Sequence, residues 1–157
     1  MEKAKSVVAL VPCLSYRQDA VEEAVALGVA LLGGIGRFVQ KEEKVLLKPN
    51  MLGGFAPDKA VTTHPAVFGA VARLFGESGY PNLSFGDSPG PRSLSISKVA
   101  EVCGLMRSAG DLSIPLADFA RGRQVQAPNG RVCRHFVICE GALQADAIIS
   151  LCKMKTH

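Results

Sequence analysis

The sequence lacks the features that mark several common classes of protein. It has no tryptophan, only two tyrosines and no block of basic residues, and its formal charge of +4 is spread along the chain. Nucleic-acid-binding proteins usually show the opposite pattern. Its first apolar stretch, residues 6–13, spans about eight residues, whereas a membrane-spanning helix needs roughly twenty, and no signal-peptide cleavage pattern follows it. We therefore expect no nucleic-acid partner, no membrane partner and a cytoplasmic location.

The cysteines also lack a recognisable pattern. The odd number of five is spread over positions 13, 103, 133, 139 and 152, without a CxxC pair or a Cys/His pair at metal-finger spacing. In a cytoplasmic protein, such cysteines are reduced and mostly buried thiols. We expect no iron–sulfur cluster on this segment alone, and the identity of any cofactor is left unknown.

What the sequence does contain is apolar residues, at 48% of 157 positions, enough for a single domain over residues 1–157 with a sizeable core. Short apolar runs alternate with stretches in which apolar residues recur at helical spacing. The runs predict strands at residues 6–13, 45–47, 82–87 and 145–152. The helical spacing predicts helices at 18–39, 65–79 and 95–108, and a single helical turn at 141–144. Right-handed crossovers favour parallel pairing, including between the first two strands.

The last third of the chain has a different pattern. A short strand at residues 113–119 contains Pro115, which places it near an edge. The turn sequence Pro128-Asn129-Gly130 separates two polar–apolar stretches, 124–126 and 131–138, and predicts an antiparallel hairpin. The predicted fold class is therefore α/β, a mainly parallel three-layer sheet with an antiparallel hairpin near the C-terminal third.

Polar residues follow the apolar run 45–47, which predicts a site at the carboxyl end of that strand. Lys48 and Asn50 come directly after it, and Thr62, Thr63 and His64 precede a helix that starts at Pro65. Free amides at that helix start would form an anion-binding corner with these side chains. Thr63 or His64 can also cap this helix. The alternative is that Thr63 merely caps it and that His64 is a surface residue.

Two further strand ends carry polar groups. Asp87 and Ser88 follow the strand at 82–87, although Asp before Ser-Pro-Gly is also a common turn initiator. Lys153, Lys155 and His157 follow the last strand. We expect these groups to converge at one sheet edge and bind an anionic small molecule. His64 and Asp87 are the candidates for proton transfer, and the ligand-binding candidates are Lys48, Asn50, Thr62, Thr63, Ser88, Lys153, Lys155 and His157. His64, Asp87 and His157 could alternatively hold a divalent metal ion, but their spacing is not diagnostic.

Four ordered motifs carry a resemblance to a known family. They are Lys48-Pro-Asn50, Thr62-Thr-His-Pro65, Gly86-Asp-Ser-Pro-Gly90, and Ala145-Asp146 followed by Lys153-Met-Lys-Thr-His157. In order and spacing they resemble the domain of unknown function 362 family over residues 45–157. The resemblance implies an α/β fold and a part in an iron–sulfur-associated redox enzyme whose cluster cysteines lie elsewhere. The alternative is a non-catalytic binding or scaffold module.

The last predicted strand bears on the extent of the protein. Residues 147–151 are typical of a strand buried on both faces, yet no amphipathic segment follows to cover it. We therefore expect this chain to be the N-terminal part of a longer protein. Alone, it would be a homo-oligomer, or would keep residues 153–157 mobile, because bare apolar patches are rare on soluble monomers.

Overall fold

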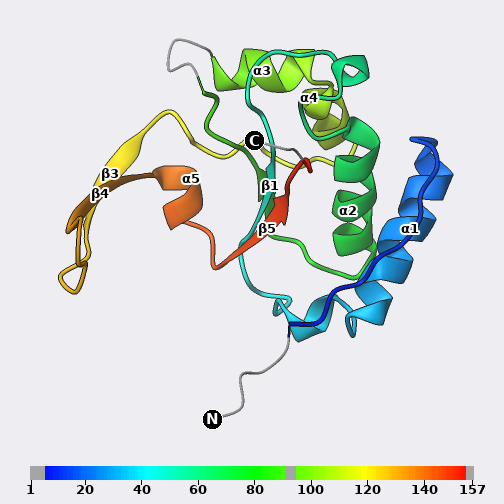
Figure 1. The fold of residues 1–157 in the computed structure, drawn as a ribbon, viewed down its shortest axis with the longest axis horizontal. Helices are drawn as coiled ribbons and strands as arrows, with labels where there is room; N and C mark the ends of the chain where they lie inside the picture. The colour runs from blue at the N-terminus through cyan, green and yellow to red at the C-terminus, as the bar shows by residue number, and fades with distance from the viewer. Residues whose placement is uncertain (1–5, 91–94, 155–157) are drawn as a thin grey trace.

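A computed structural model describes residues 6–90 and 95–154 (Figure 1). Its centre is a parallel sheet in the order β2-β1-β5, formed by β1 (Val45–Pro49), β2 (Leu83–Phe85) and β5 (Ala147–Leu151). In the register of the sheet, Leu47 of β1 pairs with Phe85 of β2 and with Ile149 of β5. All three strands therefore end at one edge, called the carboxyl edge below.

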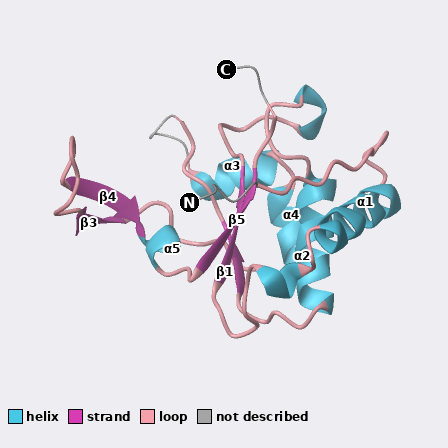
Figure 2. Ribbon diagram, turned by 60° about the horizontal axis from the view of Figure 1, so that its bottom comes forward, coloured by secondary structure: helices cyan, strands magenta, loops and turns pink. Residues whose placement is uncertain are grey.

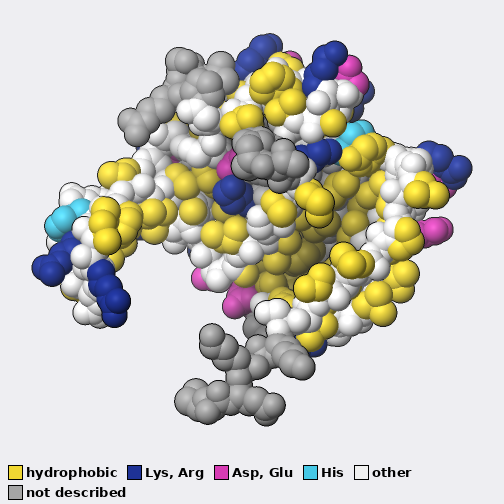
Figure 3. Space-filling view, viewed as in Figure 1, with side chains coloured by type: hydrophobic (Ala, Val, Ile, Leu, Met, Phe, Trp, Pro, Cys, Tyr) yellow, Lys and Arg dark blue, Asp and Glu magenta, His cyan; other side chains and the backbone are white. Residues whose placement is uncertain are grey.

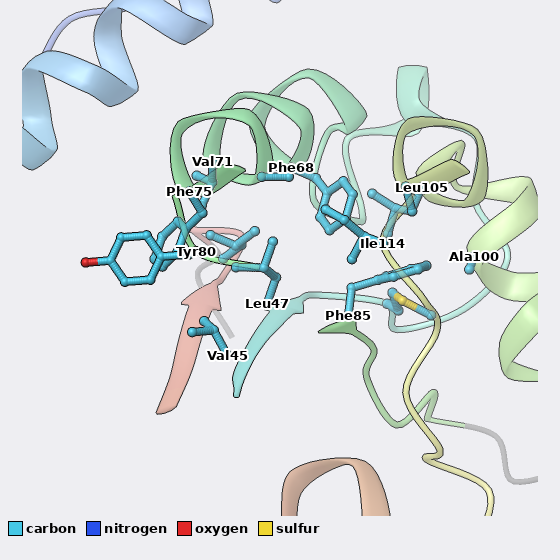
Figure 4. Close-up of a cluster of buried hydrophobic side chains, with 14 of the residues drawn as sticks. Val45, Leu47, Phe68, Val71, Phe75, Tyr80, Phe85, Ala100, Leu105 and Ile114 are labelled. Atoms are coloured by element: carbon cyan, nitrogen blue, oxygen red, sulfur yellow. The ribbon is translucent and has the colours of Figure 1, made fainter. Parts of the chain in front are cut away.

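The central position of β1 follows from its composition. Val45, Leu46 and Leu47 are each at most 1% exposed, because a continuous apolar run is stable only where both faces of the strand are covered. Around one face of β1, Phe68 and Phe75 of α2 pack with Phe85 and Ile114 into the main hydrophobic core (Figure 4).

Helices cover the two faces of the sheet unequally. One face carries α1 (Gln18–Leu31), α2 (Pro65–Glu77) and α4 (Leu105–Gly110), while the one-turn α5 (Glu140–Leu143) lies on the other side (Figure 2). In this group α2 is central, because it packs against α1 on one flank and α4 on the other. The short α3 (Ile96–Val102) packs against α4, and two 3-10 turns occupy Ile35–Arg37 and Pro57–Lys59.

The predicted hairpin is present and projects from the body of the protein (Figure 1). It consists of β3 (Gly122–Gln126) and β4 (His135–Cys139), paired antiparallel. The Gly130 amide donates to the Ala127 carbonyl at 2.8 Å, which closes the turn around Pro128-Asn129. The predicted α/β class, parallel sheet and hairpin are thus confirmed. Residues 131–134 belong to the connecting loop, so their predicted place in the second strand was wrong.

The predicted first strand at residues 6–13 is wrong, as is its parallel pairing with the second. This segment is extended, but no backbone hydrogen bond joins it to another described residue. Its apolar character was recognised, but a strand needs a neighbour to pair with. The segment instead lies along α1, where Val11 contacts Gly28 at 3.6 Å from an ideal Cβ position.

One predicted helix is shorter in the structure, and another is divided into two. The helix at 18–39 ends at Leu31, because Gly33 and Gly34 take φ values of 98° and 83° that most residues avoid. The helix at 95–108 is divided into α3 and α4 by Gly104, at φ 76°. A Cβ on Gly104 would lie 3.0 Å from the Pro65 ring, so the break also admits the start of α2.

Other expectations about burial and strands were also wrong. Only Cys103 is buried, while Cys13, Cys133 and Cys152 are exposed and Cys139 is half-buried. Residues 113–119 form a single bridge, Phe85 with Leu116, instead of a strand. β5 alternates in burial and leaves Ile148 49% exposed, because it is an edge strand with one open face.

Candidate functional site

The carboxyl edge of the sheet carries an ion pair between two of the predicted residues. Lys48 stands near the end of β1, and Asp87 follows β2 by two residues. Lys48 Nζ lies 2.7 Å from Asp87 Oδ1, and Asp87 Oδ2 accepts the Met51 amide at 2.8 Å. Asp87 is buried, whereas the Lys48 side chain is 42% exposed. Asp87 therefore fixes the loop after β1 and holds the Lys48 ammonium at the edge.

Asn50 and Thr63 form a second connection at the same edge. Thr63 Oγ1 accepts the Asn50 amide at 2.8 Å and donates to the Leu151 carbonyl, so it joins the ends of β1 and β5. The Asn50 side-chain amide donates to the Val61 carbonyl. Thr62 is 2% exposed, and its Oγ1 has no hydrogen-bond partner among the described residues. Asn50 and Thr63 therefore hold the loop from β1 to α2 in place, and the Thr62 side chain is buried in this loop instead of pointing into solvent.

A third group gathers around His64. Its ring stacks on Tyr16, with centroids 3.8 Å apart and planes 11° apart. Lys153 Nζ lies 3.2 Å from the Tyr16 hydroxyl and 5.7 Å from the centre of the Tyr16 ring. Tyr16 precedes α1, His64 caps α2 and Lys153 follows β5. We call these three residues the Tyr16 cluster.

His64 is a neutral imidazole in this cluster. Its Nδ1 accepts the Ala66 amide at 3.1 Å and so caps α2. Partial burial lowers the pKa of His64 below its ordinary value of 6.5, and the nearby Lys153 ammonium lowers this pKa further. With Nδ1 acting as acceptor, the ring carries its hydrogen on Nε2. His64 is therefore better suited to donating a hydrogen bond from Nε2 than to acting as a base. The amides that we expected to be free at this helix start are therefore occupied, that of Ala66 by the imidazole and that of Val67 by the His64 carbonyl.

Of the remaining predicted residues, the structure describes only Ser88. Ser88 is exposed and lines a separate cavity of about 800 Å³ between the end of β2, the start of α3 and the hairpin. Asp118 lines the same cavity, and its hydrogen bonds with the amide and side chain of Arg121 lower its pKa. Lys155 and His157 lie outside the described residues. The structure thus pairs Lys48 with Asp87 and brings His64 and Lys153 together around Tyr16, but among the described residues no hydrogen bond joins His64 to Asp87.

Tyr16 was missed by the sequence reasoning. The available signal was its position, shortly after the apolar run 6–13, which is where a strand's carboxyl end was expected. Within the described residues, no group of three or more His, Cys, Asp or Glu is arranged to hold a metal ion. Nor does any helix there have the length and apolar character to cross a membrane.

Comparison with known proteins gives two matches. Residues 45–157 match the family described as domain of unknown function (DUF362). Over 150 residues the chain is 35% identical to the thylakoid-associated protein sll1697 of Synechocystis sp., covering 96% of this chain and 45% of that protein. The chain therefore spans less than half the length of this relative. No solved structure matches.

Proposed function

The chain belongs to the DUF362 family, and from that premise we propose that its carboxyl edge binds an anionic small molecule. The binding groups in this proposal are those of the Tyr16 cluster, with Lys48 as a further positive charge. The Lys48, His64 and Lys153 positions all fall within the part of the chain that matches the family. The position of Tyr16 lies outside the family match.

One observation carries the proposal. The ammonium of Lys153 has no carboxylate within ion-pair distance among residues 6–90 and 95–154, and its charge lowers the pKa of the neighbouring His64. A positive field is therefore left unneutralised beside two neutral donors, the Tyr16 hydroxyl and His64 Nε2–H. A carboxylate or phosphate group accepts hydrogen bonds from such donors and neutralises the ammonium.

The proposal assigns binding rather than catalysis to these residues. His64 Nδ1 is engaged in capping α2, and both oxygens of Asp87 already have partners. These contacts favour the second candidate function, a binding module whose chemistry is performed by another part of the protein. The longer relative, of which this chain covers 45%, leaves room for such a part. A role in iron–sulfur-associated redox chemistry stays a prediction from the family resemblance.

The test is an NMR titration that measures the pKa of His64 with and without inorganic phosphate or succinate. A bound anion favours the charged imidazolium and offsets Lys153, so we expect either probe to raise the His64 pKa. His135 on the hairpin is the internal control, because it belongs to β4 and not to the Tyr16 cluster.

Variants separate binding at the edge from a general salt effect. Lys153→Ala should abolish the response of His64 to the anion. Lys98→Ala should keep it, because Lys98 pairs with Glu101 on the surface of α3. An equal response in both variants, or none in the unsubstituted protein at millimolar phosphate and succinate, would refute the proposal.

A further inference from the structure

The outer edge of β5 is an unpaired strand edge. In the order β2-β1-β5, the described residues place β1 on one side of β5 and no strand on the other. The Ala147 amide donates to the Lys44 carbonyl, on the β1 side. Because alternate amides of a strand point the same way, those of Ile148 and Ser150 point outward. An open edge of this kind favours the addition of another strand.

The segment at residues 6–13 has the character of a strand that lacks its neighbour. Ala9, Val11 and Cys13 line a groove of about 520 Å³ against α1 and Val67 of α2. The alternate residues Val8 and Leu10 are 74% and 88% exposed. Apolar side chains on both faces of an extended segment are typical of a strand that a parallel sheet covers on both faces.

Helix positions indicate how far this segment lies from β5. α4 leads into the stretch that bridges to β2, so α4 flanks α2 on the β2 side and α1 lies toward β5. Packed helices are about 8–10 Å apart, roughly twice the 4.8 Å spacing of strands. The distance from α2 to α1 therefore corresponds to about two strand positions, and β5 fills one of them. Figure 3 shows a hollow floored by hydrophobic side chains between the centre of the molecule and the segment along α1.

β5 and residues 6–13 also leave the same face of the sheet uncovered. On β5, Ala147, Ile149 and Leu151 pack toward the main core, so Ile148 points to the opposite face. Val8 and Leu10 likewise point away from α1. A right-handed crossover from β1 to β2 uses α2 on the core face. A right-handed crossover leaving β5 in the other direction must therefore place its helix on the opposite face.

From these observations we propose that one helix–strand unit completes the sheet, with its strand parallel to β5 between β5 and residues 6–13. Its helix covers Ile148, Val8 and Leu10. The source we assign to it is a further part of the protein, corresponding to the sequence that sll1697 carries outside its matched 45%. The resulting sheet has the order β2, β1, β5, the added strand, and residues 6–13.

Hydrogen exchange tests the open edge in this chain. The amides of Ile148, Ser150 and residues 8–11 should exchange rapidly, and those of Ile149 and Leu151 slowly. Ser150→Pro removes an outward amide and should leave the fold intact, whereas the matched Ile149→Pro removes a bond to β1 and should destabilise it. Concentration-dependent protection of Ile148 and Ser150 would instead assign the edge to a second copy and overturn the proposal.

The same measurement on the longer relative sll1697 tests the occupant. Amides aligned with Ile148, Ser150 and residues 8–11 should have protection factors higher in full-length sll1697 than in this chain, by on the order of 100-fold or more. Equal protection in the two proteins overturns the proposal. Anion binding at the Tyr16 cluster is measured separately, so either idea can fail alone.

Discussion

The ammonium of Lys48 lies 2.7 Å from Oδ1 of Asp87, and this ion pair joins the loops that follow β1 and β2. The two partners are not equivalent. Asp87 is 10% exposed at its side chain and also accepts the buried Met51 amide, while Lys48 is 42% exposed. Asp87 is thus mainly a structural acceptor, and Lys48 keeps access to solvent.

This asymmetry predicts different losses from two substitutions at Asp87. Asp87→Ala leaves the Met51 amide without its acceptor and should lower the free energy of unfolding by about 2–3 kcal/mol. Asp87→Asn keeps an oxygen for that amide but loses the charge and the acceptor that face Lys48, which for a partly exposed pair should cost about 1 kcal/mol. Urea denaturation measures both. Equal losses would mean that the Met51 hydrogen bond contributes nothing.

A second prediction concerns Thr63, whose hydroxyl both accepts from Asn50 and donates to Leu151. Thr63→Val keeps the shape but removes both hydrogen bonds in a buried site, so unfolding should become easier by about 2 kcal/mol. Thr63→Ser retains the hydroxyl and is the matched control. If serine is as harmful as valine, the methyl group rather than the hydroxyl stabilises this edge.

The central sheet was predictable because its signals are local. The apolar run of β1 and the Pro128-Asn129-Gly130 turn each specify a conformation within a few residues. Residues 6–13 carry an equally strong local pattern but form no strand, because pairing depends on a neighbour distant in sequence. The division at Gly104 was missed for a related reason, since its close approach to Pro65 is a tertiary contact.

The candidate site was predictable only in outline. Strand ends indicated Lys48, Asp87 and Lys153, and the start of a helix indicated His64; the structure places these groups at the carboxyl edge. Partners could not be read from spacing, because the contact between Tyr16 and Lys153 spans 137 positions. The imidazole that caps α2 was one of two alternatives that the sequence alone left open.

A third prediction concerns iron–sulfur chemistry. Cys13 and Cys152 are exposed rather than buried, so burial does not protect them from reconstitution reagents. We still expect no cluster on this chain alone, because its cysteines lack cluster spacing. Anaerobic reconstitution followed by iron and sulfide analysis checks this expectation. Stoichiometric iron and sulfide with a visible charge-transfer band would contradict it.

The last prediction uses the titration of His64. Its pKa in the folded protein lies below the ordinary value of 6.5, so the unfolded chain binds more protons in the interval between the two. Stability therefore rises with pH through this interval. The stability that neutral His64 contributes to the folded protein is fully present above about pH 6.5, and it declines as the pH falls toward the folded-state pKa. Protonation also places a hydrogen on Nδ1, which cannot then accept the Ala66 amide.

His64→Asn tests this directly, because asparagine is a good helix N-cap and does not titrate. Urea unfolding of both proteins from pH 8 to pH 5 should show a greater loss for the unsubstituted protein below about pH 6.5. Lys153→Ala removes a nearby positive charge and should raise the folded-state His64 pKa, so less stability is lost on acidification. Parallel curves for the unsubstituted protein and His64→Asn would show that α2 tolerates a protonated His64, and the neutral cap assigned to it would then be wrong.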